Sequence, residues 1–263
     1  MNDTLFSLSG HTAMVTGASS GLGRTFASVL AAAGASVVLT GRRMELLEQA
    51  CAEITSQGGE AMAVNMDVTD EKTITQSFDE AERNCGCIDI LVNNSGIAHG
   101  ESALEIASSD WDRVIDTNLR GAWRVARESG ERLVKAGKPG SIINIASVTS
   151  HLPLSKVIAY SASKAAVLSA TRFLAREWAA KGVRVNSITP GFFPAEQNKK
   201  LLFNEDGTPS DRALAIYGHT PMGRFGDPSE LAGAAVYLAS EKAASFVTGS
   251  DIVVDGGFLS QTI

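Results

Sequence analysis

The chain has 263 residues, a mass of 27.6 kDa and a net charge of −6, from 23 basic and 29 acidic residues. This length fits one large domain or two small ones and is ample for a hydrophobic core. The acidic balance argues against nucleic-acid binding, which needs an excess of basic side chains. No apolar run of about 18 residues predicts a membrane span, and the N-terminus does not resemble a secretory signal, so we expect a cytoplasmic protein.

Three cysteines, Cys51, Cys85 and Cys87, are too few for a disulfide framework. Cys85 and Cys87 form a CxC pair, but no further Cys or His lies near them in the sequence. A metal site needs about three or four ligands. We therefore expect free thiols and no metal site.

Short apolar runs alternate with longer segments of helical periodicity. The runs predict strands at 12–16, 36–40, 61–65, 88–92, 141–146, 184–188 and 252–254. Helices are predicted near 22–33, 43–56, 70–83, 110–136, 158–180 and 228–239. Runs that are apolar throughout suit a parallel sheet buried on both faces. The alternation therefore predicts a three-layer α/β fold, a Rossmann-type doubly wound parallel sheet of about seven strands with helices on both faces.

No Pro-rich or Ser-rich linker and no fixed-period repeat divides the chain, so residues 1–263 are interpreted as a single domain. The polar segment at about 192–222 interrupts the alternation beyond a predicted strand end. Insertions at this place usually cover a ligand crevice, and we expect a substrate lid there. A surface excursion without function is the alternative.

A glycine-rich loop, TGASSGLG at 16–23, follows the first predicted strand and opens the first predicted helix. Gly17 permits a sharp turn, Gly21 lets the backbone approach a pyrophosphate, and Gly23 permits close packing of helix on strand. The helix N-terminus would face the anion, so the loop predicts a dinucleotide site; a merely structural turn is the alternative. The predicted contacts are Gly17, Ser19, Ser20, Gly21, Leu22 and Gly23.

The end of the second predicted strand indicates which dinucleotide binds. It carries Arg42 and Arg43 and lacks the carboxylate that would accept the ribose hydroxyls of NAD. Guanidinium groups can hold a 2′-phosphate through charge-assisted hydrogen bonds. We predict NADP(H) rather than NAD(H), with Arg42 as the first contact and Thr40 as a hydroxyl donor. The alternative is that both arginines only begin a solvated helix.

Tyr160 and Lys164 stand at positions i and i+4, on one face of a predicted helix. A nearby ammonium lowers the pKa of a Tyr hydroxyl, about 10 in reference peptides, and suits it to proton transfer. Ser147 follows the fifth predicted strand, where α/β sheets place ligands, and could hold a substrate oxygen. Asn118 is a mediocre helix former inside a predicted helix, which favours a polar role. A Tyr–Lys pair on the surface of a helix and a solvated Asn are the alternatives.

Together these motifs resemble the short-chain dehydrogenase/reductase family, in its order and over nearly the whole chain. The resemblance implies hydride transfer between a nicotinamide and a carbonyl or secondary alcohol. It implies Tyr160 as general acid/base, Lys164 as the residue that lowers its pKa and binds the nicotinamide ribose, and Ser147 as ligand of the substrate oxygen. Asn118 would anchor a water relay to Lys164. The further cofactor contacts implied by the resemblance are Asp67, Val68, Asn94, Gly96, Tyr160, Lys164, Pro190, Gly191 and Phe193.

The segment 192–222 is similar to that of sugar-acid and polyol reductases in this family, gluconate 5-dehydrogenase-like and mannonate oxidoreductase-like members among them. A small-molecule carbonyl or alcohol substrate of this kind is expected. The alternatives are a 3-oxoacyl-thioester (acyl-carrier-protein) reductase, a general carbonyl reductase and a dinucleotide sensor without catalysis. Family members usually form homotetramers, so a tetramer is expected, with a dimer second. The expected substrate contacts are His99, Ser147, His151 and Gln197.

Overall fold

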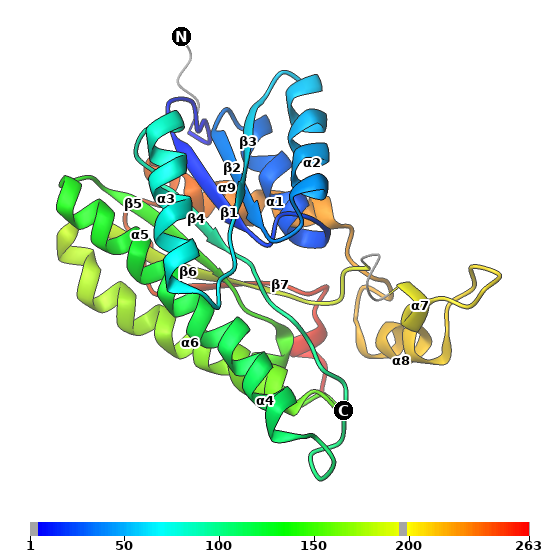
Figure 1. The fold of residues 1–263 in the computed structure, drawn as a ribbon. Helices are drawn as coiled ribbons and strands as arrows, with labels where there is room; N and C mark the ends of the chain where they lie inside the picture. The colour runs from blue at the N-terminus through cyan, green and yellow to red at the C-terminus, as the bar shows by residue number, and fades with distance from the viewer. Residues whose placement is uncertain (1–4, 195–198, 263) are drawn as a thin grey trace.

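The computed structural model describes residues 5–194 and 199–262. These residues form one seven-stranded parallel sheet in the order β3-β2-β1-β4-β5-β6-β7. The three-layer α/β fold predicted from the sequence is confirmed (Figure 1). The strands are β1 (Thr12–Thr16), β2 (Ser36–Gly41), β3 (Glu60–Asn65), β4 (Ile90–Asn93), β5 (Gly140–Ile145), β6 (Val183–Pro190) and β7 (Asp251–Val254).

Helices cover both faces of the sheet (Figure 1). Those on one face are α1 (Gly21–Ala32), α2 (Met44–Ser56) and α9 (Ala232–Ala239), and those on the other are α3 (Glu71–Cys85), α5 (Ala122–Ala136) and α6 (Ile158–Trp178). Each face buries its own apolar cluster, with Phe26 in the first and Phe78 in the second. The central strands read as continuous apolar runs because both of their faces are covered; every residue of β1 is buried.

The predicted bounds agree with the structure to within about two residues, the usual uncertainty of element ends, except in three places. The predicted helix 110–136 is found as a continuous helical stretch, but a π-helical turn, Asp116–Gly121, divides it into α4 (Ser108–Ile115) and α5. The predicted helix 228–239 begins as a 3-10 turn, Pro228–Leu231. The segment beyond β6 holds α7 (Lys199–Leu202) and α8 (Asp211–His219), which the sequence analysis did not predict.

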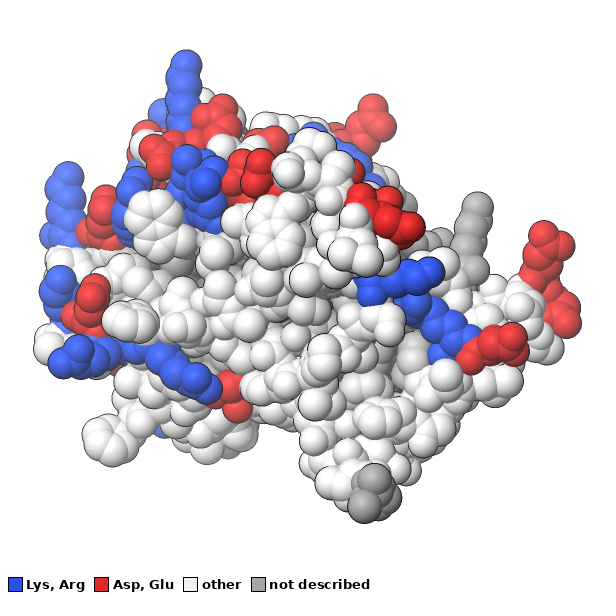
Figure 2. Space-filling model, turned by 90° about the horizontal axis from the view of Figure 1, so that it is seen from below, with Lys and Arg blue, Asp and Glu red and all other residues white. Residues whose placement is uncertain are grey.

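The excursion with α7 and α8 stands off the sheet to one side (Figure 1). A short helix α10 (Glu241–Ala244) precedes β7. The three cysteines are free thiols, as predicted. None of the described helices is long and apolar enough to cross a membrane. Seen from the side where α4 and α6 lie, the molecule presents a broad central area without Lys, Arg, Asp or Glu, and its charged side chains lie mostly toward the rim (Figure 2).

A partly buried ion pair links the residues that precede β1 and β4. His11 Nδ1 lies 2.6 Å from Asp89 Oδ2, and Asp89 Oδ1 accepts a hydrogen bond of 2.9 Å from the Thr12 backbone N–H. The hydrogen bond to Asp89 raises the pKa of His11 above its usual 6.5, although partial burial opposes the rise. The pair therefore stabilises the fold fully below pH 6.5 and loses this contribution as the pH rises through the raised pKa.

We expect His11→Gln to destabilise the protein by no more than about 1 kcal/mol, because both partners are partly exposed to solvent. The loss should be larger near pH 6 than near pH 8.5, roughly the two sides of a His titration. Urea unfolding of both proteins at the two pH values measures it. A difference in unfolding free energy that does not change with pH would show that the charge on His11 contributes nothing.

Candidate active site

The loops that follow β1 and β4 meet where the order of the strands reverses. Thr16 Oγ1 accepts hydrogen bonds from the backbone N–H groups of Asn94 and Ser95, both at 2.9 Å. Asn94 Nδ2 donates to the Thr16 carbonyl at 3.0 Å. A crevice at such a reversal is where doubly wound sheets bind their ligands. Thr16 and Ser95 were not among the predicted contacts. Their hydrogen bond holds the two loops side by side.

The glycine-rich loop has the conformation that a pyrophosphate requires. Gly17 and Gly21 have φ of +65° and +58°, in the left-handed region that favours glycine. Ser20 at the N-cap gives α1 no side-chain cap, and the first turn holds no acidic residue. The N-terminal amides of α1 are therefore left for an anion. These residues fit the phosphates of a dinucleotide.

Gly23 is the tightest position of this loop. A Cβ there would lie 2.4 Å from the Gly17 carbonyl oxygen and 2.6 Å from Asn94 Nδ2. Because the first obstacle is backbone, the loop itself would have to shift. The third glycine thus holds the helix against the strand, as the sequence predicts.

We expect Gly23→Ala to weaken binding of a dinucleotide cofactor at least tenfold and to destabilise the fold by about 1–3 kcal/mol, the usual cost of overpacking. Cofactor titration and denaturant unfolding measure the two effects. Gly233→Ala is the matched control, since Gly233 also lies in a helix and a Cβ there meets nothing within 4 Å. Equal behaviour of the two variants would contradict the tight packing at Gly23.

Arg43, rather than Arg42, faces the glycine-rich loop. Its Nη2 donates to the hydroxyls of Ser19 and Ser20, both at 2.8 Å. Arg42 is 73% exposed and its Nη1 lies 3.8 Å from Asp67 Oδ2. This geometry favours Arg43, whereas the sequence favours Arg42, and the contact of either arginine with a cofactor stays a prediction.

The prediction that Thr40 donates its hydroxyl to the cofactor is wrong. Thr40 is fully buried in β2. Its Oγ1 donates to the Val15 carbonyl at 3.3 Å and lies 3.7 Å from Met66 Sδ. The Thr40 hydroxyl points into the core, so it bonds to the neighbouring strand β1 and does not reach a ligand.

Asp67 and Val68 follow β3 beside the arginine end of the crevice. Partial burial favours a raised pKa for Asp67, but two hydrogen bonds from Thr69 and the charge of Arg42 outweigh it and hold the pKa below its usual value. Val68 is 6% exposed and packs against Gly121, where a Cβ would lie 2.9 Å from Val68 Cγ2. The two residues line the crevice next to the π-helical turn.

Ser147, Tyr160 and Lys164 gather at the carboxyl end of β5. The Ser147 side chain lies close enough to the Tyr160 hydroxyl to lower its pKa. Lys164 Nζ donates to the Ile145 carbonyl at 2.7 Å and lies 5.7 Å from the centroid of the Tyr160 ring. Ser147 also accepts a bond of 3.2 Å from the Thr149 N–H, which begins a 3-10 turn, Val148–Ser150, and fixes the serine.

Burial shifts the pKa values of both Tyr160 and Lys164. Burial raises the pKa of the Tyr160 hydroxyl, and the Ser147 side chain offsets part of the rise. Burial lowers the pKa of Lys164 to about 8. The causes of the Tyr160 shift do not include the Lys164 ammonium, whose Nζ donates to the Ile145 carbonyl, and the lowering predicted from the i, i+4 spacing stays a prediction.

Asn118 connects the loop after β4 to α6. It lies in the π-helical turn, is 1% exposed, and bonds both backbone groups of Ile97 at 2.8 Å. Its Nδ2 also donates to Ser163 Oγ at 3.1 Å, and Ser163 donates to the Tyr160 carbonyl at 2.7 Å. A Cβ on Gly96 would lie 3.3 Å from Asn118 Oδ1 and 3.5 Å from Lys164 Nζ. The predicted residues Gly96, Asn118, Tyr160 and Lys164 are thus brought together.

The residues that follow β6 pack against the chain that follows β7. A Cβ on Gly191 would lie 2.7 Å from Asp255 Cα, and the Gly191 N–H donates to Val254 O at 2.9 Å. Phe193 is 8% exposed. Its ring packs against Gly226 and belongs to the core cluster that contains Phe26. The cofactor contacts expected at Pro190, Gly191 and Phe193 stay predictions.

Two predicted substrate contacts are paired with carboxylates. His99 Nε2 lies 3.0 Å from Glu101 Oε2 and 3.8 Å from Asp110 Oδ2. His151 Nε2 lies 3.2 Å from Asp251 Oδ2 on β7. Both imidazoles are partly exposed, at 26% and 32% of their side-chain area. The third predicted contact, Gln197, lies outside the described residues.

Comparison with known proteins agrees with this geometry. A family model of short-chain dehydrogenases, described as enoyl-(acyl carrier protein) reductase, matches residues 17–259. Gluconate 5-dehydrogenase from Gluconobacter oxydans is 40% identical over 253 residues, 96% of either chain. The structure of a gluconate 5-dehydrogenase from Burkholderia cenocepacia, in complex with NADP and tartrate, is 35% identical, with a TM-score of 0.90 and 98% of both chains covered. A protein described as a D-mannonate oxidoreductase from Haemophilus influenza, solved with bound NAD, is 32% identical, with a TM-score of 0.92 and 97% of both chains covered.

Proposed function

The chain belongs to the short-chain dehydrogenase/reductase family, and on this premise we propose that it is an NADP(H)-dependent enzyme that interconverts a secondary alcohol and a ketone of a sugar acid or polyol. The observation that carries the proposal is the group formed by Ser147, Tyr160 and Lys164 at the strand ends, beside a glycine-rich loop shaped for a pyrophosphate. Such a group suits the transfer of a proton to or from a substrate oxygen.

Each side chain has a separate task in this reaction. Ser147 holds the substrate oxygen, and Tyr160 gives that oxygen a proton in reduction or takes one in oxidation. Lys164 and Asn118 hold the nicotinamide ribose and a water relay behind Tyr160. Arg43, with Arg42 beside it, holds the 2′-phosphate. When bound, the nicotinamide supplies or accepts the hydride.

A sugar acid or polyol is favoured over other carbonyl compounds because the chain matches gluconate 5-dehydrogenase over nearly its whole length. The description of the matched family model keeps an acyl-carrier-protein thioester as the second candidate. His99 and His151, both partly exposed, are the further substrate contacts that we propose among the described residues.

The test is NADPH oxidation, followed by absorbance, with a panel of keto-sugar acids, ketoses and a 3-oxoacyl thioester. The same panel is run with NADH. We expect turnover of at least one keto-sugar acid or ketose and a preference for NADPH. Turnover of the thioester alone would make an acyl thioester the substrate class. If the protein binds NADPH but turns over none of these compounds, the proposed sugar-acid or polyol substrate is contradicted.

We also propose that the chain self-associates as a homotetramer through α5 and α6. Trp123 on α5 and Ile158 and Phe173 on α6 are exposed at 42%, 42% and 63%, and the side of the molecule with α4 and α6 has a broad uncharged area (Figure 2). Exposed apolar surface of this kind is typical of interaction sites. Light scattering should give about four times the chain mass, and a monomer would contradict the proposal.

A further inference from the structure

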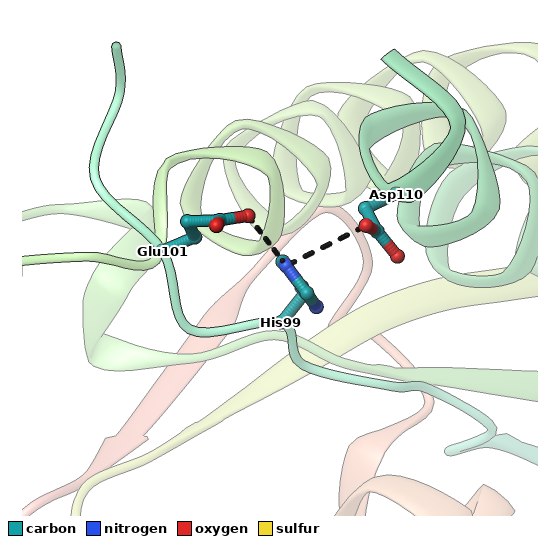
Figure 3. A group of neighbouring side chains, drawn as sticks. All are labelled: His99, Glu101 and Asp110. Atoms are coloured by element: carbon teal, nitrogen blue, oxygen red, sulfur yellow. Dashed lines mark hydrogen bonds and ion pairs between the residues drawn. The ribbon is translucent and has the colours of Figure 1, made fainter. Parts of the chain in front are cut away.

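His99, Glu101 and Asp110 direct one donor atom each toward a common point. The three atoms, His99 Nε2, Glu101 Oε2 and Asp110 Oδ2, all lie within 4.8 Å of one another. Figure 3 shows the two carboxylates on either side of the imidazole nitrogen. We propose that these three residues bind a divalent first-row transition-metal ion such as Zn²⁺. The proposal rests on the geometry of these three side chains and does not depend on the proposed function, although it gives His99 a metal ion as its ligand in place of the substrate.

The donor separations suit a single ion. Nε2 is 3.0 Å from Oε2 and 3.8 Å from Oδ2. Even with the remaining pair at its upper limit of 4.8 Å, a point exists about 2.4 Å from all three atoms, and metal–ligand bonds of about 2.0–2.2 Å need only small adjustments.

The backbone on both sides of the two loop ligands is fixed. Asn118 bonds the N–H and the carbonyl of Ile97 at 2.8 Å, just before His99. The Glu101 N–H donates to Lys156 O at 2.7 Å, and Glu101 pairs with Val157 as an isolated parallel bridge. His99 and Glu101 are two residues apart, so along an extended segment their side chains share one face. The loop thus presents both donors together.

The third donor comes from a helix and is oriented by a neighbour. Asp110 lies in the first turn of α4, and its Oδ1 is held by Arg113 Nη2 at 2.6 Å. This bond leaves Oδ2 facing His99 (Figure 3). Outer partners that fix a ligating carboxylate are a regular part of metal sites. A bound ion would therefore join the loop after β4 to α4.

The donor set selects the class of ion. One imidazole and two carboxylates suit zinc or a similar first-row ion, whereas Ca²⁺ and Mg²⁺ prefer oxygen ligands alone and Cu(I) prefers sulfur. The side chains are 26%, 37% and 30% exposed, so water can complete the coordination. Within 5–194 and 199–262, no second group of three such donors meets the same distance limit.

The experiment measures metal binding rather than turnover. Tag-free protein is dialysed against a chelator and titrated with Zn²⁺ and with Co²⁺, and the bound metal is counted by elemental analysis. We expect one ion per chain and a Co²⁺ spectrum without sulfur-to-metal charge transfer, since Cys51, Cys85 and Cys87 lie elsewhere. A thiolate spectrum, or no stoichiometric binding, would overturn the proposal.

Two ligand variants and one control make the test specific. His99→Gln and Asp110→Asn should each weaken Zn²⁺ binding by at least about tenfold. His151→Gln should leave it unchanged, because His151 has a single carboxylate partner, Asp251, and lies outside the cluster. Retained NADPH binding and circular dichroism show that each variant is folded. Equal Zn²⁺ affinity of wild type and both ligand variants would overturn the proposal.

Discussion

Replacing Tyr160 by Phe is expected to lower kcat by about 10²–10⁴-fold, the usual contribution of a positioned general acid or base. The variant keeps the ring, whose centroid lies 5.7 Å from Lys164 Nζ, and removes only the hydroxyl, whose pKa Ser147 lowers. Affinity for NADPH should therefore change by less than about threefold, because no phosphate contact is lost. Steady-state kinetics and cofactor titration measure the two quantities separately.

Tyr237→Phe is the matched control for this variant. Tyr237 lies in α9 on the other face of the sheet and packs against the core cluster there. Loss of its hydroxyl should leave kcat within about twofold, as for a surface-type change. A Tyr160→Phe enzyme with more than a tenth of the wild-type kcat would show that another group moves the proton.

The order of strands and helices was predictable because buried positions carry apolar residues at a spacing that differs between strands and helices. Strands covered on both faces are apolar throughout, as in 12–16, and the helices carry an apolar stripe. The π-helical turn Asp116–Gly121 leaves no such pattern, since one extra residue in a turn barely disturbs the 3.6 period. Asn118, a poor helix former at that place, was the signal in the sequence. Helix α8 was missed because its polar surroundings resemble a loop.

Within the site, residue types were predictable and side-chain directions were not. The glycine positions and the Ser147, Tyr160 and Lys164 group follow from spacing, and the structure brings them together. Which arginine faces the phosphate loop depends on the backbone at the start of α2, where Arg43 is the N-cap with φ of −99° and ψ of 84°. The group around His99 depends likewise on how a loop returns to α4, which no local pattern encodes.

Replacing Arg43 by Ala should raise the Kd for NADPH by about 10–100-fold and leave the Kd for NADH nearly unchanged. Its guanidinium sits 2.8 Å from the hydroxyls of Ser19 and Ser20, at the mouth of the phosphate loop. A charge-assisted hydrogen bond contributes about 1.5–3 kcal/mol, which corresponds to this change in affinity. NADH has no 2′-phosphate and loses no such bond. Fluorescence titration with both cofactors gives the two constants.

Arg42→Ala should have a smaller effect, less than about tenfold, because an arginine that is 73% exposed interacts with a phosphate through screening solvent. Arg127→Ala, on α5 with its guanidinium 4.9 Å from the Trp123 ring, is the control and should change neither constant. The opposite order of the two arginine effects would restore the ranking suggested by the sequence. A wild-type protein that binds NADH as tightly as NADPH would contradict the NADP preference itself, whichever arginine is removed.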